Sequence, residues 1–301
     1  MKKFILIMAI LTGINTRLRG SIGNYTFQRV NGQTIAKEKV EKKAVPTRSL
    51  AQMLRRMQWA NLVNLYRSFD GTLHPSFEGK DPRKSDFNMF MHANLGKNPV
   101  YLTKEQASMR GAVVASYMVT MGSLSPINVE FGNNDIPECD IALGSLTLGN
   151  STTLKAFSDA VVQNNSDWRS GDQLSVYIAR QMVDAGTGVP RVVIEAVEVT
   201  LDTAGDTTML SDLMDTSLFG VVDGCLALSG PVNGGVAMVH SRKLKGQTVV
   251  STQSFVVNNS YLASYQTAAA FNSAVKSYGG VDSDQFLTPN LDDVVAIDVN
   301  P

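Results

Sequence analysis

Apolar and polar residues alternate in two short runs near the start of the chain, GNYTFQRV at 23–30 and QTIAKEKV at 33–40. Asn31-Gly32 joins them, and this pair favours a type I′ turn because both positions need positive φ. The pattern predicts a β-hairpin whose two-residue loop sets three cross-strand pairs on one face: Tyr25 with Glu38, Phe27 with Ala36, and Arg29 with Thr34. Since an isolated ribbon is marginal in water, its Tyr25 and Phe27 side must pack on something else.

The apolar spacing becomes helical in TRSLAQMLRRMQWANLVNLYRSF, which has Thr47 or Ser49 as N-cap and Asp70-Gly71 after its end. At about 100° per residue, two apolar stripes lie almost opposite each other. The first stripe holds Leu50, Met53, Leu54 and Met57, and the second holds Trp59, Leu62, Val63 and Tyr66. The helix is expected either to pack against two different bodies, one of which could be another subunit, or to be buried all round in one domain.

An irregular connection follows over residues 70–102, interrupted by a short helix at SDFNMFMHANLG with Ser85 as cap and Gly96 as stop. TKEQ at 103–106 is a capping-box pattern that predicts a further short helix. So long a connection inside a compact domain is usually functional or covered by a partner.

Short runs rich in Val, Ile, Leu and Thr dominate the chain from about residue 112. They predict strands at 112–120, 127–131, 140–148, 173–182, 190–201, 224–229, 235–241 and 247–257. Two helices are expected among them, STTLKAFSDAVVQN and SYLASYQTAAAFNSAVKSYGG, before an acidic tail. The predicted fold is β-rich α+β: an N-terminal β-hairpin plus a long helix, then a sandwich- or barrel-like β domain with two inserted helices.

Charge divides the chain although the totals balance at 27 basic and 27 acidic residues. Residues 1–110 hold 19 Lys and Arg against 7 Asp and Glu, whereas residues 111–301 hold 8 against 20. This contrast indicates a basic interaction region (1–110) and an acidic β-rich domain (111–301). Such halves attract each other between neighbouring copies, which favours self-association.

The first residues, MKKFILIMAILTG, have the basic start and apolar run of a signal peptide but are followed by no small-residue cleavage site. The run is also far shorter than the about 20 residues of a membrane-spanning helix. A buried strand or an arm is therefore favoured over an export signal. Cys139 and Cys225 could pair, but free buried thiols are favoured because two cysteines make no disulfide framework.

Motifs of catalysis are missing from the sequence. His74, His92 and His240 stand alone, without the spacing of a zinc site, and there is no phosphate-binding loop or nucleophile elbow. The aspartates between 202 and 223 lack the spacing of a calcium loop and indicate a solvated acidic face. We therefore assign no catalytic, cofactor-binding or metal-binding residue, expect no cofactor, and do not expect an enzyme.

Nucleic-acid binding is a second possibility for the basic region. Between residues 17 and 56, ten basic residues are interleaved with Tyr25, Phe27 and Trp59, a set able to neutralise phosphates and stack bases. No named nucleic-acid motif accompanies them, and the acidic half offers an internal partner for the charge.

Three segments carry a resemblance to a known family: LTGINTRLRGSIGNYTFQRVNGQTIAKEKV, PTRSLAQMLRRMQWANLVNLYRSF and SDFNMFMHANLGKNPVYLTKEQA. They resemble an uncharacterised family of gut Bacteroidetes and of the crAss-like tailed bacteriophages that infect them. GGVAMVHSRKLKGQTVVSTQSFVVNN is similar to that family's ending, and the middle of the chain is unmatched. The resemblance implies a virion structural protein, a ring-forming subunit of the short tail or neck near the portal, assembled in the host cytoplasm.

The expected function is thus a non-enzymatic subunit of a homo-oligomeric ring, of about twelve copies to match a portal. Expected partners are the protein itself, the portal or other tail ring proteins, and DNA without sequence specificity. The alternatives are a DNA-binding virion or host protein and an exported Bacteroidetes surface protein. The expected subunit interface consists of Tyr25, Phe27, Arg29, Arg55, Arg56, Trp59, Leu62, Val63 and Tyr66.

Overall fold

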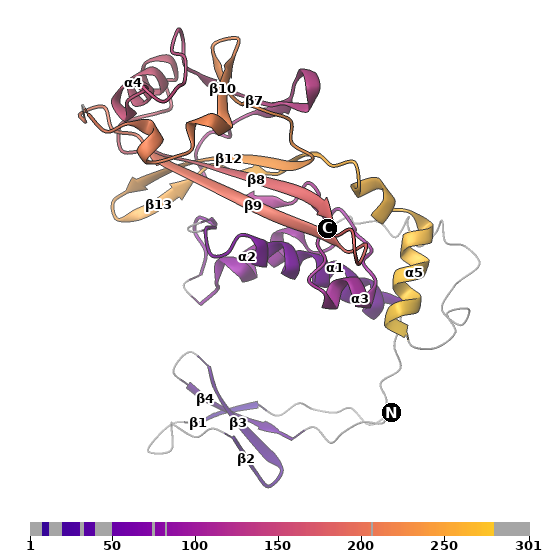
Figure 1. Ribbon diagram of the computed structural model, residues 1–301. Coiled ribbons are helices and arrows are strands. Elements are labelled where there is room, and N and C mark those ends of the chain that lie inside the picture. Colours follow the sequence, from indigo (N-terminus) through magenta and orange to yellow (C-terminus); the bar gives the residue numbers. More distant parts are fainter. Residues whose placement is uncertain are drawn as a thin grey trace. The chain divides into compact units, whose positions relative to one another are not determined.

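The computed structural model describes residues 8–11, 20–30, 33–39, 50–73, 76–81, 83–205 and 207–279. The chain divides into two compact units, residues 1–48 and residues 49–301 (Figure 1). We call them the N-terminal unit and the body. The boundary predicted near residue 110 is not where the units divide, because residues 50–110 supply helices that pack into the core of the body.

The N-terminal unit is a four-stranded antiparallel sheet in the order β1-β4-β3-β2. Its strands are β1 (Met8–Leu11), β2 (Gly20–Ile22), β3 (Tyr25–Val30) and β4 (Gln33–Glu38). The predicted hairpin is confirmed as β3 and β4, with the expected register of Tyr25 opposite Glu38 and Phe27 opposite Ala36. Part of the apolar N-terminal run forms β1 beside β4. The turn residues Asn31 and Gly32 lie outside the described residues.

The body is α+β, and its described strands form open antiparallel sheets without a closed barrel. The large sheet runs β13-β12-β8-β9, with β15 also pairing with β12. Its strands are β8 (Gln173–Val183), β9 (Pro190–Thr200), β12 (Gly234–Leu244), β13 (Gln247–Val250) and β15 (Val256–Asn258). A second sheet runs β10-β11-β7-β6, and β14 pairs with β5. These strands are β5 (Met118–Thr120), β6 (Val129–Phe131), β7 (Pro137–Ala142), β10 (Phe219–Val222), β11 (Cys225–Leu228) and β14 (Gln253–Ser254).

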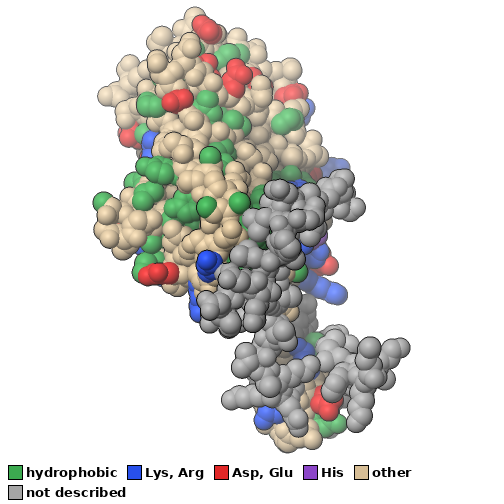
Figure 2. All heavy atoms as spheres, turned by 90° about the vertical axis from the view of Figure 1, so that its right-hand side faces the viewer, with side chains coloured by type: hydrophobic (Ala, Val, Ile, Leu, Met, Phe, Trp, Pro, Cys, Tyr) green, Lys and Arg blue, Asp and Glu red, His purple; other side chains and the backbone are tan. Residues whose placement is uncertain are grey.

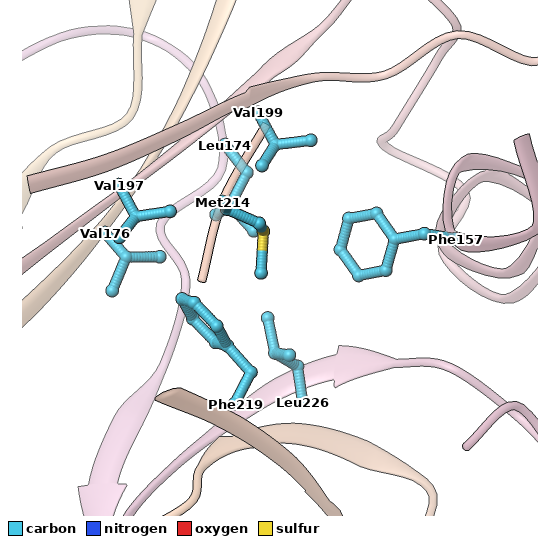
Figure 3. A pocket seen from close by; sticks show the side chains of 8 residues that line it. All are labelled: Phe157, Leu174, Val176, Val197, Val199, Met214, Phe219 and Leu226. Carbon is cyan, nitrogen blue, oxygen red and sulfur yellow. The ribbon is translucent and has the colours of Figure 1, made fainter. Parts of the chain in front are cut away.

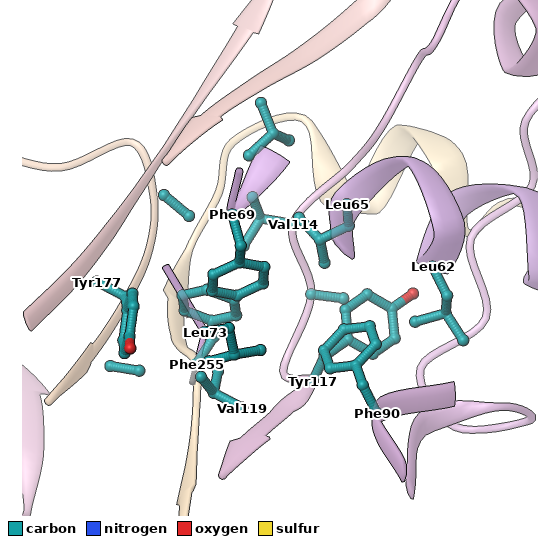
Figure 4. Packing of buried hydrophobic residues seen from close by; sticks show 14 of the residues in the cluster. Leu62, Leu65, Phe69, Leu73, Phe90, Val114, Tyr117, Val119, Tyr177 and Phe255 are labelled. Carbon is teal, nitrogen blue, oxygen red and sulfur yellow. The ribbon is translucent and has the colours of Figure 1, made fainter. Parts of the chain in front are cut away.

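Both faces of the large sheet are covered, so the body has three layers. Successive side chains of a strand point to opposite faces. On β8, Val176 and Ile178 enter one buried cluster, while Tyr177 and Ala179 enter the other. We call the cluster that contains Tyr177 and Ala179 the helix-side cluster. It is centred on aromatic rings (Figure 4), including Phe69, which stacks on Phe255 with ring centroids 5.9 Å apart.

The helices of the body are α1 (Leu50–Ser68), α2 (Asp86–Asn94), α3 (Lys104–Ser108), α4 (Leu154–Asn164) and α5 (Ala268–Gly279). Figure 1 shows α1, α2 and α3 on one side of the large sheet and α4 on the other. Ser85 caps α2, and Thr103 with Gln106 closes the predicted capping box at α3. Thr47 and Ser49, the cap candidates of α1, and residues 280–301 lie outside the described residues.

The two apolar stripes of α1 pack against two different parts of this same chain. Met53 and Met57 form a buried cluster with Phe271, Ala274 and Val275 of α5. The other stripe joins the helix-side cluster against the large sheet. The switch of apolar face predicted from the sequence therefore has an explanation inside one subunit.

The layer on the far face of the large sheet, residues 129–167 and 200–228, is called the outer layer here. It contains the second sheet, α4 and the loops between them. Between this layer and the large sheet lies a cavity of about 10 Å³, lined only by apolar side chains such as Phe157, Met214 and Phe219 (Figure 3). A space this small and apolar is a packing defect that stays dry.

Two predicted strands differ from the structure. The run 112–120 forms a strand only at β5, because the backbone N–H groups of Val113 and Val114 donate to the amide side chains of Asn61 and Gln181 instead of to a neighbouring strand. The run 140–148 is displaced to β7, which begins at Pro137 and ends at Ala142. Strand β10 was not predicted.

Candidate functional site

The N-terminal unit presents aromatic and aliphatic side chains to solvent. Tyr25 is 55% exposed and Ile22 is 65% exposed, and Phe27 is half-buried. Among the side chains described in this unit, only Thr34 is buried, and none belongs to a buried apolar cluster. A sheet of this size whose described side chains form no buried apolar cluster is a candidate for completion by a partner.

The predicted interface residues on α1 fall into two groups. Arg55 and Arg56 are exposed, and Trp59 is 46% exposed, although its ring edge meets Phe87 with centroids 6.3 Å apart. These three residues are available to a partner.

Leu62, Val63 and Tyr66 are not available in the same way. Leu62 is 1% exposed within the helix-side core, and Val63 packs against it. Tyr66 sits among aromatic rings, 5.1 Å from the ring of Phe87. The prediction that these residues lie in a subunit interface is corrected, because the second stripe of α1 packs into the core of its own chain. The backbone of Arg29 pairs with Thr34, and its side chain lies outside the described set.

Charge also divides at the structural boundary, although the net charges there, +8 and −8, are smaller than the +12 and −12 on either side of residue 110. Residues 1–48 hold 10 Lys and Arg against 2 Asp and Glu, and residues 49–301 hold 17 against 25. Within the body the excess of acidic residues is concentrated in the outer layer, which holds 11 Asp and Glu and a single basic residue, Lys155. Figure 2 shows acidic side chains gathered at its upper end, over this layer.

A buried charged cluster lies where β8 and β12 meet. Asp172 accepts a hydrogen bond from Nε2 of His240 at 2.8 Å, and both side chains are 2% exposed. The guanidinium of Arg242 binds the same carboxylate through two hydrogen bonds. Nε donates to Oδ1 and a terminal nitrogen donates to Oδ2, both at 2.7 Å. Trp168 stacks on the His240 ring with centroids 3.9 Å apart. The cluster ties the turn before β8 to β12.

The pKa values of this cluster follow from burial and pairing. Burial lowers the pKa of His240, and this outweighs the opposing effect of the Asp172 hydrogen bond. Burial alone would raise the pKa of Asp172, but the hydrogen bonds from Arg242 and His240 hold it below its ordinary value. A neutral histidine therefore sits on an ionised carboxylate at neutral pH.

This arrangement lacks the third member of a catalytic triad. In such a triad the second ring nitrogen of histidine contacts a nucleophilic hydroxyl or thiol. Among the described residues, no hydrogen bond reaches Nδ1 of His240. The cluster is a structural one in this geometry.

The lowered pKa of His240 predicts a pH dependence of stability. Between its folded pKa and the ordinary value of 6.5, the unfolded chain binds a proton that the folded chain does not. The free energy of unfolding should therefore decrease as the pH falls through this window, by up to about 1.4 kcal/mol per pH unit. Urea unfolding between about pH 7.5 and about pH 5 should show a smaller slope for His240→Gln than for the wild type. An equal slope in both proteins would contradict the assignment, since Asp172 titrates below this range.

The other titratable candidates carry no evident chemistry. Cys139 and Cys225 are free thiols on neighbouring strands, and burial raises the pKa of Cys139 to about 12. Cys225 is half-buried rather than buried. The described part of the chain contains no group of three His, Cys, Asp or Glu side chains placed to hold a metal ion. No helix in the described ranges is long and apolar enough to cross a membrane.

Acidic loop residues act as local caps. Asp202 accepts from the backbone N–H groups of Ala204 and Gly205, and Asp215 accepts from Ser217. His74 lies outside the described residues, and His92 is exposed.

The sequence did not identify Trp168, Asp172 or Arg242. Asp172 precedes His240 by 68 positions and Arg242 by 70, and they meet because the pairing of β12 with β8 places His240 opposite Leu174. The available signal was weak: a histidine and an arginine two residues apart on one strand, whose side chains share a face.

Comparisons with known proteins return no relatives. No protein-family model matches the chain, and neither the curated proteins nor the solved structures contain a match.

Proposed function

We propose that the protein is a non-enzymatic structural subunit that assembles with copies of itself into a ring, in the tail or neck of a tailed-bacteriophage virion. One observation carries the proposal: a basic sheet, whose described side chains belong to no buried apolar cluster, is joined to a body of opposite charge. Ring closure requires a heterologous interface, in which one surface of a copy meets a different surface of the next. A basic sheet and an acidic layer are such a pair.

The position in a virion rests on the family resemblance of the first 110 residues. Portal and tail rings are the partners that this resemblance implies. The ring contacts are assigned to the exposed residues Tyr25, Arg55, Arg56 and Trp59 and to the half-buried Phe27.

Removal of the N-terminal unit tests self-assembly. Deleting residues 1–45 should abolish the oligomer and leave the body folded, because the three buried clusters contain no residue from that segment. Sedimentation velocity measures assembly, negative-stain imaging shows whether a ring closes, and circular dichroism checks the fold. An oligomer of unchanged size would contradict the proposal, as would a full-length chain that stays monomeric with and without its portal.

A charge-reversal pair gives a finer comparison. Lys37→Glu with Lys39→Glu changes two basic residues of β4 and its end, whereas Lys84→Glu with Lys97→Glu makes the same change in charge on exposed residues of the body. The first variant should weaken assembly by at least about tenfold, and the second by much less.

Non-specific DNA binding is the second candidate, favoured by the excess of basic residues in the N-terminal unit and by exposed Tyr25. In this case affinity for DNA would fall steeply with salt, and the Lys37/Lys39 variant would reduce the slope of log affinity against log salt by about 2. A salt-independent affinity would exclude this function.

A further inference from the structure

A polar hollow of about 260 Å³ opens in the body beside the buried cluster. Its walls come from the segment before β6, from β7, from the end of α4 and from β12. It is lined by Ser125, Pro126, Ile127, Asp140, Ile141, Asn164, Asn165, Ser166, Asp167, Trp168 and His240. Ligand pockets for small molecules span about 300–1,000 Å³, so this hollow suits a group the size of one side chain.

The electrostatics of the hollow favour a cation. Asp140 and Asp167 are exposed carboxylates in its wall, and no lysine or arginine lines it. The last residue of α4, Asn164, lines the hollow, and the last turn of this helix contains no basic residue. A helix C-terminus carries a partial negative charge that a cation stabilises. The nearby cation Arg242 is already held by Asp172.

His240 adds a buried hydrogen-bond acceptor to the same wall. Its side chain is 2% exposed, and Nε2 donates to the carboxylate of Asp172. In the neutral ring this leaves Nδ1 as an acceptor, and no group in the described ranges bonds to it. The hollow thus offers two exposed carboxylates and has His240 in its lining, so a ligand that donates N–H bonds is favoured over an anion or a phosphate.

We propose that the hollow receives a lysine or arginine side chain from the N-terminal unit of a second copy of this chain. This proposal rests on the proposed self-assembly and identifies the hollow as the site on one copy that binds the N-terminal unit of the next. Two features of the chain point to that occupant: ten of the 12 charged residues of the N-terminal unit are basic, and the layer around the hollow has 11 acidic residues against one basic. An arginine could pair with a carboxylate of Asp140 or Asp167 and donate to His240 at once.

Binding of a free probe tests the hollow without assembly. L-Argininamide is titrated at low salt into full-length protein diluted until sedimentation shows monomers, and the fluorescence of Trp168 in the hollow wall reports binding. L-Citrullinamide, which has the same shape without the charge, is the ligand control. The wild type should bind L-argininamide at least about tenfold more tightly than L-citrullinamide. Equal binding of the two probes, or no binding of L-argininamide, would overturn the proposal.

Two isosteric variants localise the effect. Asp140→Asn with Asp167→Asn removes both carboxylates of the hollow, and Asp212→Asn with Asp223→Asn removes two exposed carboxylates elsewhere in the outer layer. The first variant should lose about tenfold in affinity for L-argininamide, and the second should bind as the wild type does. Equal losses would mean that overall charge, and not the hollow, attracts the probe.

Assembly of the same variants identifies the occupant. The Asp140/Asp167 variant should assemble at least about tenfold more weakly than the Asp212/Asp223 variant. If the hollow variant binds no probe yet assembles normally, the occupant is not a second copy, and only this inference fails. If the wild type forms no oligomer at all, the proposed function fails and the second copy as occupant fails with it, whereas the probe titration still decides whether the hollow binds a cation.

Discussion

Replacing Asn61 with alanine should destabilise the body by about 3 kcal/mol or more, because two backbone groups in the core lose their partner. The side chain of Asn61 accepts from the N–H of Val113 at 2.8 Å and donates to the carbonyl of the same residue at 3.1 Å. It also donates to the hydroxyl of Tyr117 at 3.0 Å. The amide thus replaces a neighbouring strand for a segment that is wholly buried.

Urea unfolding measures this effect, with Asn88→Ala as the matched control on an exposed position of α2. The control should change the free energy of unfolding by less than about 0.5 kcal/mol. A small loss for Asn61→Ala, comparable to the control, would mean that water or another group satisfies Val113 in its place.

Replacing Asp172 with asparagine should cost about 3–5 kcal/mol, since it leaves Arg242 without its carboxylate and turns one of the two oxygens that accept from Arg242 and His240 into an NH2 donor. The double variant Asp172→Asn with Arg242→Met should recover part of this loss, because the unpaired cation is then removed. Asp212→Asn, at an exposed site, serves as the control.

Thermal and urea unfolding of the wild type, the single variants Asp172→Asn and Arg242→Met, and the double variant give the coupling energy between Asp172 and Arg242. Additive effects of the two replacements would show that the pair contributes nothing beyond its separate members. The lowered pKa of Asp172 stabilises the fold above the ordinary value of 3.8, and this stabilisation is lost as the pH falls from there towards the folded pKa. The free energy of unfolding of Asp172→Asn should lack this decrease.

Local pattern was sufficient where each element is specified by its own residues. The register of the hairpin followed from the two-residue loop, and the caps Ser85 and Thr103 could be predicted because capping needs only neighbouring residues. The frequent β-rich runs predicted an α+β fold with helices between strands, which is confirmed.

Contacts between elements far apart in the sequence could not be predicted from local pattern. The sequence left open whether the two apolar faces of α1 meet two bodies or are buried in one domain, and in the structure α5, more than 200 residues later, covers one of them. Leu62 was therefore assigned to an interface although it lies in the chain's own core. Periodicity reports that a face is apolar and cannot report which element covers it.

The same limit applied to the site. Composition alone determined that the chain is divided into a basic beginning and an acidic remainder, since charge is a property of residues and needs no contacts. Only the tertiary structure decided that the acidic residues gather in one layer and that Asp172, His240 and Arg242 meet beside a hollow. Antiparallel pairing of β8 with β12 brings these residues together, and a pairing between distant strands leaves no mark in either strand's own pattern.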